Sequence, residues 1–282
     1  MRYALLFCLV GIGWFDGDAQ SPWVAGKNKG FVQFGFSAIG PYSGLFLDGS
    51  ESFTLNRQVS DRTLQLYGEY GIAEKTSLLA VLPFKMMATG STVSDPTTTP
   101  TQIEEGNFST IGNIQLAIRQ NFINSQYVLS GQLGFELPAA GFDESTGLRG
   151  GLDAFSIIPS ISIGAGSKKV YGYLSAGVAI RTNDYSSEFR LGGEAGYQVL
   201  NRIYAIVVLD VVSNFENGNA VDDIRQIQTG MYLNNQSFFA YGLKGIIGFT
   251  DNIGLTAGYY GAASGNVVAR SPSLNAGVYY KW

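Results

Sequence analysis

The residues of this chain with the clearest chemical potential are isolated charges within otherwise apolar stretches. Carboxylates at such positions can support acid–base hydrolysis. Carboxylates interleaved with cations more often brace a protein interior or set the charge preference of a water-filled passage. We expect one of these two roles, bracing or selectivity, and the pattern leaves both open. The candidates are Glu69, Lys85, Arg119, Glu136, Arg181, Arg190, Glu194, Asp210 and Lys244.

Several familiar kinds of catalysis cannot be built from this composition. The chain contains no histidine, so a hydrolase that relies on a histidine base is excluded. The single cysteine, Cys8, lies in the N-terminal apolar run, which leaves no thiolate for catalysis or metal binding once that run is removed. No nucleophile elbow, phosphate loop or dinucleotide motif occurs. We therefore predict that the protein is not an enzyme and uses no cofactor and no metal.

Acidic pairs occur in three stretches that are polar enough to be loops: Glu104-Glu105, Asp143-Glu144 and Asp222-Asp223. Their spacing matches no calcium-binding loop, so we interpret them as solvated loop tips. The formal net charge is −4 and no basic run is present. Nucleic acid is therefore not an expected partner.

The elements that carry these charges are strands, because apolar and polar residues alternate with a period of two. We count twelve such segments, each long enough for a tilted membrane strand. They cover residues 29–40, 61–72, 76–88, 110–122, 126–138, 153–165, 169–181, 188–199, 203–213, 236–250, 253–263 and 270–282.

The connections between these segments alternate between short turns and longer polar loops. The longer ones include residues 41–59, 89–108, 139–151 and 214–235. Such alternation is typical of transmembrane barrels, whose turns are short on the periplasmic side. Because lipid satisfies no backbone hydrogen bond, the first and last strands must pair. We predict an all-β fold, a single closed antiparallel barrel of about 12 strands.

The two ends of the chain indicate export to the bacterial outer membrane. Arg2 precedes an apolar run over residues 3–15, and Gly17-Asp18-Ala19 supplies small residues for cleavage. We predict a signal peptide over residues 1–19 and the barrel over residues 20–282. The last strand ends in an alternating pattern that resembles the signal recognised by the barrel-assembly machinery, through Gly277, Tyr280 and Trp282. Expected partners are this machinery, outer-membrane lipids and a small-molecule solute.

Two stretches resemble a known family. Residues 67–84 and 111–119 are similar to a hairpin and the following strand in outer-membrane proteins of the MetA-pathway of phenol degradation family, with Asn113 in place of the usual Asp. The resemblance covers roughly residues 60–215. It implies a barrel that passes or binds small compounds, hydrophobic or aromatic ones among them. It supplies no binding residues to carry over.

Two hypotheses follow. The first is an outer-membrane channel that conducts or binds small molecules, including hydrophobic or aromatic ones, with residues 89–108 and 214–235 screening the outer mouth. The alternative is a non-conducting structural or assembly subunit whose lumen is plugged by its own side chains or by residues 214–235.

Overall fold

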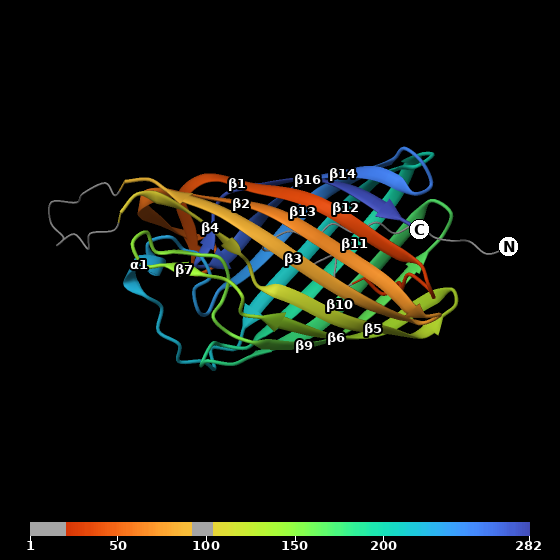
Figure 1. Ribbon diagram of the computed structural model, residues 1–282, viewed down its shortest axis with the longest axis horizontal. Helices are drawn as coiled ribbons and strands as arrows, with labels where there is room; N and C mark the ends of the chain where they lie inside the picture. The colour runs from red at the N-terminus through yellow and green to blue at the C-terminus, as the bar shows by residue number, and fades with distance from the viewer. Residues whose placement is uncertain (1–20, 92–103) are drawn as a thin grey trace.

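The chain folds into one closed β-barrel (Figure 1), seen in a computed structural model that describes residues 21–91 and 104–282. Over these residues, twelve long antiparallel strands form the wall. They are β1 (Gly30–Leu47), β2 (Glu51–Ala73), β3 (Thr76–Thr89), β5 (Ile114–Asn124), β6 (Tyr127–Leu137), β9 (Ser156–Gly166), β10 (Val170–Arg181), β11 (Glu188–Leu200), β12 (Ile203–Asn214), β13 (Ser237–Gly248), β14 (Ile253–Asn266) and β16 (Ser273–Lys281). The number and the antiparallel arrangement predicted from the sequence are confirmed.

The barrel closes between its first and last strands, as the lack of hydrogen-bonding partners in lipid requires. Strand β1 pairs with β16 over nine positions, from Phe31 opposite Lys281 to Ile39 opposite Ser273. On its other side β1 pairs with β2. The start of β1 and the C-terminus lie at the same end of the barrel (Figure 1), together with the short turns after β2, β5, β9, β11 and β13. We call this end the turn end and the opposite one the loop end.

Side chains alternate between the outside and the inside along each strand. On β16, Leu274, Val278 and Tyr280 are exposed, whereas Ser273, Asn275 and Tyr279 between them are buried. The same alternation holds along β2 and β3. Exposed Leu, Ile, Val and aromatic side chains therefore cover the outer wall, which is the surface that a lipid-embedded barrel presents.

The structure corrects two sequence-based boundaries. Residues 41–59 are not a loop: β1 and β2 continue through most of this stretch as a long hairpin, and only residues 48–50 connect them. The segment predicted at 110–122 is divided into β4 (Gly106–Ile111), which pairs with β3, and β5. The predicted signal peptide and the centre of the 89–108 loop lie outside the described residues.

The loop end also carries small elements outside the wall. Strands β7 (Phe142–Asp143) and β8 (Leu148–Arg149) pair with each other, β15 (Val268–Ala269) pairs with β1, and α1 (Ile224–Ile227) follows β12. Between them lies a packed core that we call the mouth cluster: Tyr42, Leu45, Leu55, Val59, Met87, Leu148, Met231 and Ala269. Among the described residues, no helix has the length and apolar character needed to cross a membrane.

Candidate functional site

The interior of the barrel is the candidate site, because the charges predicted from the sequence are buried there. The side chains of Glu69, Lys85, Arg119, Glu136, Glu188, Arg190, Glu194, Asp210 and Lys244 are buried, and that of Arg181 is 9% exposed. Their position on the inner face follows from the period of two. Their predicted role in ion selectivity stays a prediction.

Most of these charges form ion pairs between neighbouring or facing strands. Lys244 Nζ lies 2.5 Å from Glu194 Oε1, which links β13 to β11. Lys85 Nζ lies 2.7 Å from Asp61 Oδ2, which links β3 to β2. Both pairs are almost fully buried, so each cation compensates a carboxylate that water cannot reach. This geometry favours the bracing role over free selectivity charges at these positions.

A second network joins β6, β10 and β11. Arg181 and Arg190 each lie 2.7 Å from Glu188 Oε1, and Arg190 Nη2 also lies 4.0 Å from Glu136 Oε2. Asn113 donates a hydrogen bond of 2.8 Å to the other oxygen of Glu136. The family resemblance implies an aspartate at position 113. Asn113 instead donates to the Glu136 carboxylate, which would repel an aspartate at this position.

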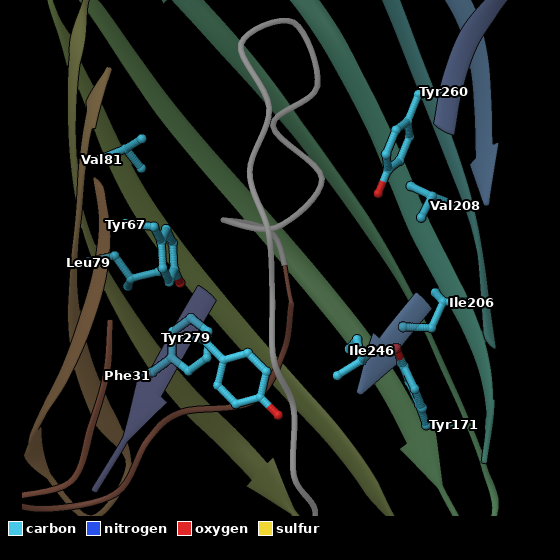
Figure 2. Close-up of a cluster of buried hydrophobic side chains, with 10 residues drawn as sticks. All are labelled: Phe31, Tyr67, Leu79, Val81, Tyr171, Ile206, Val208, Ile246, Tyr260 and Tyr279. Carbon is cyan, nitrogen blue, oxygen red and sulfur yellow. The ribbon is translucent and has the colours of Figure 1, made fainter. Parts of the chain in front are cut away.

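An apolar belt also lines the interior, in addition to the charges predicted from the sequence. Two groups of inward side chains lie on opposite walls (Figure 2), one from β1, β2, β3 and β16 and the other from β10, β12, β13 and β14. We call this set the apolar belt: Phe31, Tyr67, Leu79, Val81, Tyr171, Ile206, Val208, Ile246, Tyr260 and Tyr279.

The belt is visible in the sequence as consecutive apolar residues, which a search for alternation alone does not detect. Leu78 is 45% exposed and its neighbour Leu79 4%, and Val207 is 48% exposed and Val208 5%. Unbroken apolar runs in a barrel strand therefore indicate that both faces are apolar. Aromatic contacts hold part of the belt together, since the Phe31 ring lies 5.8 Å from Tyr67 and 5.6 Å from Tyr279.

Residues 21–29, which we call the N-terminal segment, cross the interior near the turn end. Arg119 Nη1 donates to the carbonyl of Trp23 at 2.9 Å, and Asn121 Nδ2 donates to that of Pro22 at 2.7 Å. The Trp23 ring reaches the far wall, with its centroid 5.8 Å from that of Tyr173 on β10. The strand order places β10 opposite β1, so the segment spans the barrel.

The sequence around Gly71 permits this crossing. A Cβ at Gly71 would lie 1.8 Å from the carbonyl oxygen of Gly26, so no larger residue fits where the N-terminal segment passes over β2. Hydrogen bonds from Asn28 N to Gly71 O (2.8 Å) and from Gly71 N to Lys29 O (2.9 Å) then guide the chain into β1.

Residues 215–236, which we call the mouth loop, cover the loop end. This loop starts from β12 but reaches β1 and β2: Tyr42 donates to Thr229 O at 2.9 Å. The Arg57 guanidinium donates to the carbonyls of Thr146 (2.6 Å) and Gln228 (3.2 Å). Met231 is completely buried in the mouth cluster. The stretch 214–235, predicted to screen the mouth or to plug the lumen, thus folds over the mouth.

Two acidic residues expected at a solvated loop tip instead organise the mouth loop. Hydrogen bonds from Arg225 lower the pKa of Asp223 to about 2, and its carboxylate caps the first turn of α1 through Arg225 N. Burial raises the pKa of Asp222, which accepts the Asn234 backbone N–H with both oxygens at 3.0 Å. Among the described residues, no group of three or more potential metal ligands occurs.

The three residues of the predicted assembly signal lie on β16 and at its end. Tyr280 and Trp282 point outward, each 46% exposed, with their rings stacked 5.8 Å apart. Gly277 faces inward, where a Cβ would lie 2.6 Å from Gln33 Nε2. This close packing is a structural reason for a glycine at position 277. The part of Gly277 in assembly stays a prediction.

Removing residues 21–25 tests the closure at the turn end. We expect ion conductance in planar bilayers to rise severalfold, because Trp23 and the carbonyls bound by Arg119 and Asn121 leave the interior. A Lys27→Gln and Lys29→Gln variant is the matched control, since both side chains are exposed. Equal conductance in the shortened and full chains would show that the segment does not obstruct passage.

Comparison with known proteins supports the barrel assignment through structure alone. No family model and no curated protein matches the sequence. The fold is similar to the COG4313 outer membrane channel from Pseudomonas putida F1, with a TM-score of 0.66, 13% identity and coverage of 94% of this chain and 98% of that chain. It is also similar to the NanC porin, with a TM-score of 0.50, 8% identity and coverage of 90% and 100%. The fold is that of an outer-membrane β-barrel of the kind found in channels and porins.

Proposed function

We propose that this protein is a bacterial outer-membrane channel that admits small apolar or aromatic molecules and is closed at rest by the N-terminal segment and the mouth loop. The apolar belt is the observation that carries the proposal. A barrel that passes polar solutes has a polar interior. Here ten inward-facing apolar or aromatic side chains from eight strands line the interior.

The belt gives an apolar solute a reason to enter. Transfer of apolar surface from water to an apolar environment gains about 25 cal/mol per Å², so a solute that buries roughly 100 Å² gains about 2.5 kcal/mol. Tyr67, Tyr171 and Tyr260 add aromatic faces and hydroxyl groups. Such rings prefer edge-to-face or offset contacts with an aromatic solute.

One set of observations favours the alternative, a structural barrel that conducts nothing. The N-terminal segment and the mouth loop fill opposite ends of the barrel through specific hydrogen bonds, and buried ion pairs brace the wall between them. In the channel proposal these closures open for the solute. In the alternative they stay closed.

Uptake by a bacterial host that lacks its own porins separates these functions. We expect cells that express the protein to take up radiolabelled toluene faster than empty cells, with no matching gain for arabinose. Replacing Val81 and Val208 by threonine keeps their shape while making the belt polar. We expect this double variant to lose most of the toluene gain.

The control is a check that each variant is folded, by its heat-dependent migration in gels. A folded wild-type protein that raises toluene uptake no more than empty cells do would exclude the channel and leave the structural barrel. A threonine variant with full uptake would show that the belt does not select the solute.

A further inference from the structure

The outer wall carries an apolar groove near the turn end. It has a volume of about 660 Å³, within the roughly 300–1,000 Å³ typical of ligand sites. Gly68 and Ala80, which face each other on β2 and β3, leave the wall low at this point. Larger side chains rise around them: Tyr70, Leu78, Ile118 and Trp282.

Exposed lysines flank the end of this groove. Lys29 ends the N-terminal segment, and its carbonyl accepts a backbone hydrogen bond from Gly71, one residue beyond Tyr70. Lys75 lies in the turn between β2 and β3, one residue before the strand that carries Leu78. Both side chains are exposed. Two exposed lysines therefore adjoin the ends of the strands that form the groove.

The other lysines of the chain show the same preference for the turn end. The chain contains eight lysines, and two of them, Lys85 and Lys244, are buried in ion pairs. The other six all belong to the turn end: Lys27, Lys29, Lys75, Lys168, Lys169 and Lys281. Short turns face the periplasm in barrels of this type. In that orientation, the turn end that carries these six lysines would face the periplasmic leaflet.

From the groove and its flanking cations together, we infer that the outer wall over β1, β2, β3 and β5 binds an anionic phospholipid of the periplasmic leaflet. An acyl chain lies in the groove over Gly68 and Ala80, and Lys29 and Lys75 bind the phosphate and the headgroup. Trp282 and Tyr70 occupy the level at which aromatic side chains contact lipid headgroups. The site requires insertion into a membrane but not passage of a solute.

Fluorescence quenching by brominated lipids tests this site, because Trp282 lines the groove. In a chain that begins at Gln20, the tryptophans are Trp23 and Trp282. A Trp23→Phe background leaves Trp282 as the single reporter. The protein is reconstituted in phosphatidylcholine vesicles that contain a minor fraction of either brominated phosphatidylglycerol or brominated phosphatidylcholine. We expect phosphatidylglycerol to quench at a severalfold lower mole fraction.

Three variants locate the preference. Replacing Lys29 and Lys75 by glutamine should reduce the selectivity for phosphatidylglycerol by about fivefold for each lysine. Replacing Lys168 and Lys169 by glutamine removes the same charge from the turn between β9 and β10 and should leave the selectivity unchanged. Replacing Gly68 and Ala80 by leucine should reduce quenching by both lipids, and the space beside Gly68 accepts a side chain.

Each possible result decides the matter. Equal quenching by the two lipids in the Trp23→Phe background would overturn the headgroup site. An equal loss of phosphatidylglycerol selectivity in the Lys168 and Lys169 variant would overturn it as well. Unchanged quenching after the groove is filled would overturn the acyl-chain site. These results do not depend on toluene uptake, so failure of the channel proposal and failure of the lipid site can be distinguished.

Discussion

Replacing Arg57 by leucine is expected to open the loop end and to raise the open probability in single-channel recordings on the order of tenfold. The Arg57 guanidinium is buried and donates to backbone carbonyls of Thr146, Arg225 and Gln228. It thereby ties the β7–β8 connection and the mouth loop to β2. Hydrogen bonds from a charged donor contribute about 1.5–3 kcal/mol each. Losing even one changes the open population by about tenfold, since 1.4 kcal/mol corresponds to that factor.

The matched control for this variant is Arg62→Leu on the same strand. Arg62 is exposed and faces outward, so its loss removes an equal charge without releasing the mouth loop. Planar-bilayer recordings of the refolded chain provide the measurement for both variants. If the two variants conduct alike, Arg57 does not control the mouth. If neither conducts and the chain without residues 21–25 is also silent, the barrel is structural.

Replacing Lys244 by methionine is expected to lower the free energy of unfolding by about 3–5 kcal/mol, the usual cost of leaving a buried charge unpaired. Lys244 and Glu194 are each 1% exposed, and the carboxylate has one other hydrogen-bonding partner, the hydroxyl of Tyr171 at 3.3 Å. Without Lys244, the buried carboxylate of Glu194 loses its cation. Urea titration of the protein folded in lipid vesicles measures the change.

A double variant separates the charge from the packing. Glu194→Gln in combination with Lys244→Met removes both charges and keeps an acceptor for Tyr171. Replacing a complete buried pair by neutral groups is often nearly neutral, so we expect most of the lost stability to return. A single variant as stable as the parent chain would show that water reaches this pair in the folded protein.

The wall of the barrel is predictable from the sequence because its physics is local. Alternation with a period of two identifies the strands and predicts the side of each residue, and Glu136 and Lys244, which it assigns to the inner face, are buried. The closure of β1 on β16 follows from the absence of backbone partners in lipid. Strand ends are predictable only approximately, since β1 and β2 continue through residues 41–59, where glycine, serine and proline residues resemble a loop.

The filling of the barrel is not predictable in the same way, because its contacts join residues far apart in the sequence. Trp23 carries no periodic pattern, and the residues that bind the N-terminal segment begin at Glu69, 44 residues from Ala25. The partner of Arg57 at Gln228 is 171 residues away. The apolar belt is visible as unbroken runs such as Ile206–Leu209, but a search for lining charges alone passes over them.

Because of the mouth cluster, the stability of this molecule depends on two different solvents, lipid for the wall and water for the cover of the mouth. An outer-membrane barrel is solvated by lipid along its wall, where exposed apolar side chains cost nothing and backbone hydrogen bonds hold the structure. Tyr42, Leu148 and Met231 are instead packed at the loop end as in a soluble domain, where exclusion of water supplies the stability. Urea, osmolytes and temperature act on that exclusion. For a barrel in the outer membrane, the aqueous medium therefore sets the stability of the cover, while the membrane sets that of the wall.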